Sequence, residues 1–300
     1  MDSFNSLIVK VTELMPKSVV GYFSRRYIAG ETLIDGVSVV KDFNSRGIYA
    51  TMDVLGESVK NKKEAGSAKN KALEVYQAIV ENNLSSNLSI KPTQLGLSID
   101  DNFAYDQVKE LVVKAKEINN FLRIDMEDSP YTDKTFNLYK RLRKDFDNVG
   151  VVVQSKLRRT YDDVSALKEF NTNFRLCKGI YLEKESIAYQ GKQEVRDNYL
   201  KILELMFKNN HYVGIATHDE YLVDKAYIMI KDMNIPKEKF EFQMLLGVKE
   251  NLRERINKDG YKMRVYVPFG KDWYPYSIRR LKENPNMAGD IVKNIFRMGK

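Results

Sequence analysis

The chain has 300 residues, a formal net charge of +8, a hydrophobic fraction of 43% and a charged fraction of 30%. This length allows one large domain or two small ones, and the composition is ordinary for a soluble globular protein. No run approaches the roughly 20 consecutive apolar residues that a membrane-spanning helix needs, so we expect no such helix.

The cysteine and histidine content narrows the chemistry. Cys177 is the only cysteine, which rules out an intrachain disulfide and fits a reducing cytoplasm. The two histidines, His211 and His218, have no ligand-like spacing to Cys177, so we expect no metal site. The first residues, Met1 to Asn5, lack the basic-then-apolar pattern of a secretory signal.

The positive net charge has two interpretations. A nucleic acid or an anionic membrane surface would be attracted by it. The lysines, however, are spread through helix-like segments and interleaved with acidic residues, without a long block of like charge. We therefore favour a solvated, lysine-rich exterior and expect no nucleic-acid partner, although an anionic ligand or a membrane surface would also gain from the charge.

Residues 1–46 are predicted to be helical. An apolar stripe at helical spacing precedes Pro16 and consists of Leu7, Ile8, Val11, Leu14 and Met15. Such a stripe is typical of a packing face. The basic pair Arg25 and Arg26 nearby leaves a membrane anchor as the alternative.

From residue 47 onward, short apolar runs alternate with longer segments of helical period. The eight strand candidates are Gly47–Leu55, Leu88–Lys91, Phe121–Met126, Val149–Gln154, Phe174–Lys178, Tyr212–Thr217, Phe240–Met244 and Met263–Val267. Helical segments between them include Ala65–Glu81, Tyr105–Asn119, Thr132–Phe146, Glu194–Asn209 and Glu220–Met233. This order predicts an α/β protein with a closed (βα)8 barrel over residues 47–300, in one domain with the N-terminal helical segment 1–46. A doubly wound open sheet is the alternative.

The last repeat carries a distinctive strand and helix. Pro268 and Gly270 are expected to end the strand Met263–Val267. Asp272 is expected to cap a helix that runs to Glu283 and lies over the C-terminal rim of the barrel.

Two adjacent arginines, Arg279 and Arg280, lie on this final helix. Arginine binds a carboxylate in a planar, bidentate way, so the pair is a candidate anion clamp. Pairing of both arginines with Glu283 on the helix surface is the plainer interpretation. The five aromatic residues from Tyr266 to Tyr276 argue against it, because a solvated helix rarely needs them.

Polar residues mark the ends of most predicted strands, which is where barrel enzymes carry their active residues. They are Lys91, Asp125, Gln154, Lys178, Thr217 with His218, Gln243 and Tyr266. A strand end entering solvent would explain any one of them, but all would face one rim. Cations and amides there suit an anionic ligand together with a large polar heterocycle.

Several common active-site motifs are missing from the chain. It has no G-x-S-x-G elbow, no G-x-G-x-x-G and no Walker A loop, which argues against hydrolase, Rossmann and P-loop chemistry. Lys91 and Lys178 leave a Schiff-base aldolase-type barrel as one alternative. A nucleic-acid-binding protein is the other, although no RRM, KH or helix-turn-helix signature is present.

Taken together, these segments resemble the proline dehydrogenase family, the FAD-dependent (βα)8 flavoenzymes of proline catabolism. The matching segments are Thr51–Glu57, Ser89–Leu97, Ile124–Asp128, Val151–Gln154, Arg175–Tyr181, Ala216–Asp219, Glu241–Leu245 and Arg264–Glu283. They follow family order over residues 25–290. No aldehyde dehydrogenase domain follows them, so the chain resembles the short, monofunctional bacterial type.

The resemblance implies oxidation of L-proline to Δ1-pyrroline-5-carboxylate by hydride transfer to FAD, with electrons passed to a membrane quinone. This would be the first step of proline degradation to glutamate, with a pyrroline-5-carboxylate dehydrogenase acting downstream. Because a quinone lies in lipid, we expect a cytoplasmic protein with peripheral contact at the inner face of the cell membrane.

The resemblance also implies roles for single residues. Those implied to bind substrate are Lys91, Tyr181, Tyr276, Arg279, Arg280 and Glu283, with Tyr276 disfavouring a 4-hydroxyl on the proline ring. Those implied to be catalytic are Asp125, Arg175 and Tyr266. Those implied to bind FAD are Met126, Gln154, Arg175, Lys178, Gly179, Ile180, Thr217 and His218.

Three of these roles have alternatives. Asp125 is implied either to orient the neighbouring cations or to take part in proton transfer. Glu57 is implied to pair with Arg279 as a gate, with helix capping as the plainer role. For Tyr181 and Tyr266, core packing with a satisfied hydroxyl is the alternative.

Overall fold

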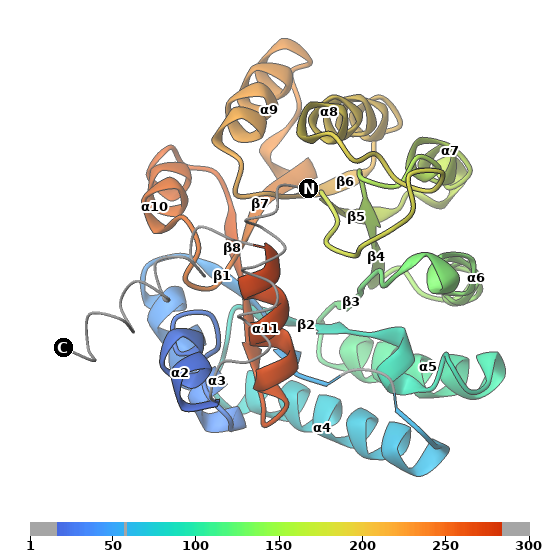
Figure 1. Cartoon of the computed structure of the whole chain (residues 1–300), viewed down its shortest axis with the longest axis vertical. Coiled ribbons are helices and arrows are strands. Elements are labelled where there is room, and N and C mark those ends of the chain that lie inside the picture. Colours follow the sequence, from blue (N-terminus) through green and yellow to red (C-terminus); the bar gives the residue numbers. More distant parts are fainter. Residues whose placement is uncertain (1–16, 57–58, 284–300) are drawn as a thin grey trace.

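Eight parallel strands pair in chain order and close, β8 against β1, into a barrel surrounded by helices (Figure 1). The structure is a computed structural model that describes residues 17–56 and 59–283, without the side chains of residues 18–19, 22–23 and 279–283. The predicted (βα)8 fold is confirmed, and the open sheet is wrong. The apolar stripe predicted at residues 7–15 lies outside the described residues.

Every strand is followed by a helix. The strands are β1 (Tyr49–Val54), β2 (Ser86–Ile90), β3 (Leu122–Ile124), β4 (Val149–Gln154), β5 (Asn173–Cys177), β6 (Tyr212–Ala216), β7 (Phe240–Leu245) and β8 (Met263–Phe269). The helices that follow them in turn are α4 (Lys62–Glu81), α5 (Asp101–Glu117), α6 (Thr132–Arg143), α7 (Thr160–Ser165), α8 (Lys192–Lys208), α9 (Glu220–Asp232), α10 (Glu250–Lys258) and α11 (Trp273–Glu283). Before the barrel come α2 (Lys17–Ser24) and α3 (Leu33–Ser45), and short 3-10 turns occur at η1 (Pro92–Leu95), η2 (Ser129–Tyr131), η3 (Lys168–Phe170) and η4 (Lys237–Lys239).

Side-chain caps fix where several helices begin. Thr32 accepts a hydrogen bond from the backbone of Asp35, whose carboxylate accepts one from the backbone of Thr32, so α3 starts with a capping box. Asn61 caps α4 and Asp100 caps α5 through their side-chain oxygens. These bonds satisfy amide groups that a helix start leaves without partners.

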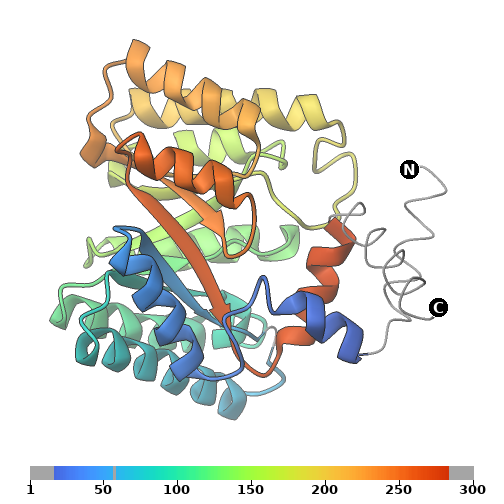
Figure 2. The ribbon, with the colours of Figure 1, turned by 90° about the vertical axis from the view of Figure 1, so that its left-hand side faces the viewer.

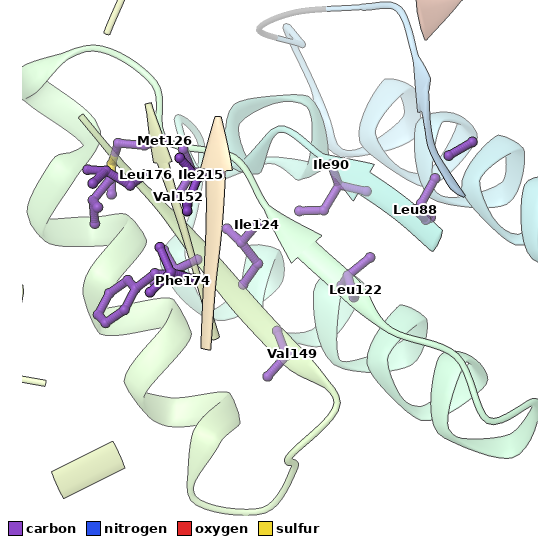
Figure 3. Packing of buried hydrophobic residues seen from close by; sticks show 14 of the residues in the cluster. Leu88, Ile90, Leu122, Ile124, Met126, Val149, Val152, Phe174, Leu176 and Ile215 are labelled. Carbon is purple, nitrogen blue, oxygen red and sulfur yellow. The ribbon is translucent and has the colours of Figure 1, made fainter. Parts of the chain in front are cut away.

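The apolar core lies between the strands and the surrounding helices. Because side chains alternate across a strand, every second residue faces the helices. Figure 3 shows such residues from neighbouring strands, among them Leu88 and Ile90 of β2, Leu122 and Ile124 of β3, and Phe174 and Leu176 of β5. All are buried, and burial of each such side chain contributes roughly 1.5–3 kcal/mol. The residues between them on each strand are left to face the inside of the barrel.

The final helix, α11, lies across the C-terminal end of the barrel with α2 beside it (Figures 1 and 2), as predicted. Trp273 donates a hydrogen bond from Nε1 to Oε1 of Glu31 at 2.8 Å, and its ring lies against Gly21 of α2. Tyr276 packs with Ile28 and Leu55. The segment before the barrel therefore helps to hold α11 over the rim.

Helix α3 shares the packing of the barrel, because it lies against β1 and β8, whereas α2 lies against α11. The domain division at residue 46 stays a prediction. Within the described ranges, no helix has both the length and the apolar character needed to cross a bilayer.

Strand β8 runs further than predicted. The prediction ended it at Val267, because Pro268 has no backbone N–H to donate. In the structure β8 continues to Phe269, and the carbonyl of Pro268 accepts a hydrogen bond from the amide of Ala29 at 2.9 Å. Register pairing with β7 already stops at Tyr266, so no ladder bond on that side needs the missing N–H. The expectation that Pro268 ends the strand is wrong.

His211 lies buried at the start of β6, away from the C-terminal rim. Its Nδ1 accepts a hydrogen bond from the backbone amide of Thr172 at 3.1 Å, and its ring meets that of Phe174 edge-on. Burial and the nearby charge of Lys239 lower the pKa of His211 to about 4. The histidine is therefore neutral in the folded state at neutral pH, as its acceptor role requires.

We predict that His211 makes the protein less stable in mild acid. Its pKa is lower in the folded state than in the unfolded state, so the unfolded state gains more protons as the pH falls below about 6.5. The loss grows to about pH 4 and should be on the order of 2 kcal/mol. Denaturant unfolding of the wild type and of His211→Gln between pH 7.5 and pH 4.5 checks this, since the variant should lose stability less steeply. Parallel pH profiles would contradict the assignment.

Candidate active site

Polar side chains fill the inside of the barrel towards the C-terminal ends of the strands. Arg175 of β5 donates hydrogen bonds to Asp125, which follows β3, and to Gln243 of β7. Tyr266 of β8 donates to the same Asp125. These bonds join strands that are not neighbours in the barrel, so they must cross its interior.

Asp125 is the centre of this group. Its Oδ1 accepts hydrogen bonds from Oγ of Ser89 at 2.6 Å and from Nη1 of Arg175 at 2.8 Å. Its Oδ2 accepts one from the hydroxyl of Tyr266 at 2.9 Å. Loss of water around the hydroxyl and the negative charge of Asp125 raise the pKa of Tyr266 well above its usual value. Both oxygens of the carboxylate are therefore engaged, and three strands hold it in place.

Lys91 follows β2 and forms a buried ion pair with Asp53 of β1. Its Nζ lies 3.1 Å from Oδ1 and 3.0 Å from Oδ2 of Asp53. The side chain of Asp53 is only 1% exposed. Burial alone would lower the pKa of Lys91, but the carboxylates of Asp53 and Asp125 raise it above its usual value. Lys91 is thus a fixed ammonium group.

Two further tyrosines were predicted to bind substrate. Tyr276 of α11 borders the same cavity as Lys91. The backbone carbonyl of Tyr181 accepts a hydrogen bond from Nζ of Lys156 at 3.0 Å. Tyr276 is 6% exposed. Tyr276 is therefore packed in the protein interior and also borders the site.

A cavity of about 410 Å³ lies beside Lys91. Leu55 and Gly56 border it after β1, Gln94 borders it in η1, and Tyr276 borders it in α11. This volume is in the range of small-molecule sites. A small ligand in the cavity would lie beside Lys91 and Tyr276.

The residues predicted to bind a cofactor form a second group, at the ends of β4, β5 and β6. Gln154 donates from Nε2 to the carbonyls of Met126 and Glu127, so the backbone of Met126 lies at this rim while its side chain joins the apolar core (Figure 3). Gly179 has φ of 97°, and a Cβ there would come within 2.7 Å of Oε1 of Gln154. Glycine is therefore required where the chain passes Gln154.

The other members of this group lie close by. Nζ of Lys178 is 3.4 Å from a carboxylate oxygen of Asp219, which Arg196 also binds. His218 accepts a hydrogen bond at Nε2 from the backbone amide of Leu245 at 2.9 Å. The remaining predicted members are the buried Thr217 and the 37% exposed Ile180.

Some predicted residues lie outside the described part of the chain. Glu57 is one, and so are the side chains of Arg279, Arg280 and Glu283, although the backbone of all three belongs to α11. The predicted clamp and gate therefore stay predictions. Among the described residues, no group of three or more histidine, cysteine or acidic side chains could hold a metal ion.

Sequence reasoning gave no role to several members of the interior group. Asp53 and Ser89 belong to segments that the prediction used, but no role was given to either. Glu241, 2% exposed, was likewise passed over. The available signal was their phase, because each lies one residue from an apolar residue in a strand and therefore faces the inside of the barrel.

Comparison with known proteins agrees with this geometry. The family model for proline dehydrogenase matches residues 37–293. Proline dehydrogenase 1 of Bacillus subtilis (strain 168) is 34% identical over 274 residues, which cover 91% of each chain. Proline dehydrogenase 2 of the same strain is 36% identical over 270 residues, covering 90% of this chain and 89% of that one. Proline dehydrogenase of Deinococcus radiodurans is 32% identical over 279 residues, covering 91% and 90%.

Solved structures show the same barrel. The structure of proline utilization A from Bdellovibrio bacteriovorus, inactivated by N-propargylglycine, superposes with a TM-score of 0.81 and 26% identity over 87% of this chain. The chain spans 32% of the length of that protein. A variant of proline utilization A from Bradyrhizobium japonicum superposes with a TM-score of 0.75 at 19% identity, a likeness of fold alone.

We predict that Asp53→Asn destabilises the protein strongly. The substitution leaves Lys91 buried without a counter-charge, which costs about 3–5 kcal/mol. The double variant Asp53→Asn/Lys91→Met should recover much of this loss, because no uncompensated charge remains. Asp42→Asn removes the exposed partner of Arg46 and is the matched control, expected to change stability by less than about 0.5 kcal/mol. Thermal and denaturant unfolding give the three values, and a double variant no more stable than Asp53→Asn would refute the pairing.

Proposed function

The chain belongs to the proline dehydrogenase family, and we propose that it oxidises L-proline to Δ1-pyrroline-5-carboxylate with FAD as hydride acceptor. The observation that carries the proposal is the network of Asp125, Arg175 and Tyr266 inside one end of the barrel, together with Lys91, which borders a cavity of about 410 Å³. A small zwitterion such as proline needs a fixed cation for its carboxylate, and Lys91 supplies one.

The substrate carboxylate is proposed to bind Lys91, Arg279 and Arg280. Lys91 lies at the cavity, and α11 carries the two arginines past Tyr276, which also borders it. A carboxylate held by fixed cations has one orientation, and orientation can contribute several kcal/mol to lowering the barrier. Tyr276 is proposed to pack against the ring and to disfavour a 4-hydroxyl, with Tyr181 on the side of Lys91.

The residues at the rim fit FAD. Arg175 uses Nε and Nη1 within the barrel, and its Nη2 has no partner among the residues that the structure describes. Gly179 brings bare backbone to the rim beside Gln154, with Lys178 next in the chain. A planar ring with carbonyl and nitrogen acceptors suits these donors. Residues proposed to hold it are Met126, Gln154, Arg175, Lys178, Gly179, Ile180, Thr217 and His218.

FAD, when bound, supplies an acceptor for the hydride that leaves C5 of proline. Arg175 offers a fixed positive charge where negative charge develops, and such preorganised charge is worth far more in a water-poor site than in solution. Asp125 accepts hydrogen bonds at both oxygens. We therefore assign Asp125 and Tyr266 to holding Arg175, and Asp125 is better suited to this than to proton transfer.

Access and partners are also proposals. Glu57 is proposed to pair with Arg279 as a gate that shields the site, with Glu283 near the clamp. A membrane quinone is proposed as the final electron acceptor, which requires peripheral contact of a cytoplasmic protein with the membrane. A pyrroline-5-carboxylate dehydrogenase would consume the product.

A Schiff-base aldolase is the alternative function. It needs a neutral amine on a lysine. Lys91 is held as an ammonium group by Asp53, with its pKa raised, and Lys178 lies beside Asp219. The environment of Lys91 disfavours its neutral form, which argues against this chemistry at that residue.

We predict that the purified protein carries FAD and is yellow. Absorption near 450 nm, the general region of oxidised flavins, should fall when L-proline is added without oxygen. Addition of a soluble quinone should restore it. A colourless protein that does not gain colour with added FAD would refute the proposal, and a borohydride-trapped lysine adduct with a carbonyl substrate would favour the aldolase.

We predict that the charge-compensated double variant Asp53→Asn/Lys91→Met and Arg280→Met each raise KM for proline. Loss of one charge-assisted hydrogen bond costs about 1.5–3 kcal/mol, or roughly 10- to 100-fold in affinity. FAD content should not change, because none of these residues is assigned to the cofactor. Lys134→Met, which removes a cation paired with Asp101 on the barrel exterior, is the matched control and should keep the wild-type KM. Unchanged KM in the two site variants would contradict the clamp.

A further inference from the structure

A buried chain of polar groups runs from Arg175 towards the opposite end of the barrel. Nε of Arg175 donates to Oε1 of Gln243 at 2.6 Å, and Nε2 of Gln243 donates to Oε1 of Glu241 at 2.6 Å. Glu241 in turn accepts from Nε and Nη2 of Arg264 at 2.6 Å and 3.1 Å. Gln243 is 5% exposed and Glu241 is 2% exposed, so neither is a surface group that happens to lie near the site.

The carboxylate of Glu241 determines which way the amide of Gln243 faces. Burial would raise the pKa of Glu241, but Arg264 and Lys262 lower it to about 2, so it is ionised and can only accept hydrogen bonds. The amide must therefore turn its nitrogen to Glu241 and its oxygen to Nε of Arg175. A rotated amide would place its NH2 group against the guanidinium and its oxygen against the carboxylate.

Gly214 of β6 leaves the room that Gln243 occupies. A Cβ at residue 214 would lie 2.4 Å from Nε2 of Gln243, which real Cβ contacts do not reach. Gly214 pairs with Glu241 in the register of β6 and β7, directly beside the chain of hydrogen bonds. The lack of a side chain at Gly214 therefore leaves the space in which the side chain of Gln243 lies.

We infer that Gln243 and Glu241 are positioning residues for Arg175, and that they fix its guanidinium so that Nη2 faces the cofactor. The inference rests on the proposed flavin chemistry. Asp125 and Ser89 hold Nη1 of Arg175 from one side, and Gln243 holds Nε from the other. A planar group held at two of its nitrogens cannot turn, so its third nitrogen has a defined direction.

The test compares Gln243→Met with Thr51→Val. Both remove a buried polar side chain from the barrel interior, but Thr51 bonds Asn87 and does not contact Arg175. Gln243→Met should lower kcat about 10- to 100-fold, the effect of slight misplacement at a reacting centre, with KM for proline within about twofold of wild type. The midpoint potential of the bound flavin should become more negative, because a misdirected cation stabilises the reduced ring less. Thr51→Val should change neither value.

Two further variants show that the effect passes through Arg175. Gly214→Ala keeps Gln243 but displaces it, and should shift the flavin potential in the same direction. In an Arg175→Met background, adding Gln243→Met should change the potential and kcat no further, because the residue it positions is absent. Additive effects in this double variant would overturn the inference.

Failure of the inference and failure of the proposed function have different signatures. A yellow wild type that proline reduces, with Gln243→Met and Gly214→Ala both keeping the wild-type flavin potential, would overturn this inference alone. A colourless wild type that binds no FAD would overturn the proposed function and the inference with it.

Discussion

Charges inside the barrel persist only because each has a partner placed by another strand. An unpaired charge in a protein interior costs several kcal/mol, so the interior residues of this barrel depend on one another. Lys91 needs Asp53, Arg175 needs Asp125, and Arg264 needs Glu241. Most (βα)8 barrels fill this space with branched apolar side chains. Here the apolar packing is carried by the layer between strands and helices, which leaves the interior free for polar groups.

Arg123 shows how far this requirement extends. It is 2% exposed and, in place of a carboxylate, binds the backbone carbonyls of Val151 and Asn173. Burial and the nearby Arg175 lower its pKa to about 9, so it is still protonated at neutral pH. Backbone carbonyl groups of neighbouring strands thus stabilise the charge of Arg123 without a carboxylate partner. The interior therefore has an excess of positive character below the site where an anionic ring is proposed to bind.

The sequence predicted the elements better than the contacts. Apolar runs such as Val149–Gln154 identify all eight strands, because a parallel strand buried on its outer face needs such a run. The short helix α7 and the polar helix α10 were not among the predicted segments, since their apolar stripes are brief. The prediction at Pro268 was wrong because proline ends a strand only where its missing N–H would have made a ladder hydrogen bond. That depends on strand register, which local sequence does not reveal.

Some residues of the candidate site could also be predicted from the sequence, and others could not. Lys91, Asp125 and Arg175 could be named from strand ends and from resemblance, because each type has a chemical use that is visible without a structure. Asp53 and Glu241 could not, since a lone acid in a strand has no meaning until its partner is known. Their partners lie 38 and 23 residues away in the chain. The parallel pairing of β1 with β2 and of β7 with β8 brings them together, and this pairing is a property of the folded sheet.

The position of α11 extends the argument beyond the barrel. Helix α11 contacts α2 and the residues that follow α2 in the chain. Trp273 bonds Glu31 and packs on Gly21, while Tyr276 packs with Ile28. The backbone that carries the two arginines therefore depends on a segment at the other end of the chain. The proposed clamp uses those arginines, so under this proposal the helices before β1 are part of what positions it. In the proposed site the barrel would supply the fixed charges below the ligand, and α11, held by the segment before β1, would supply those above it.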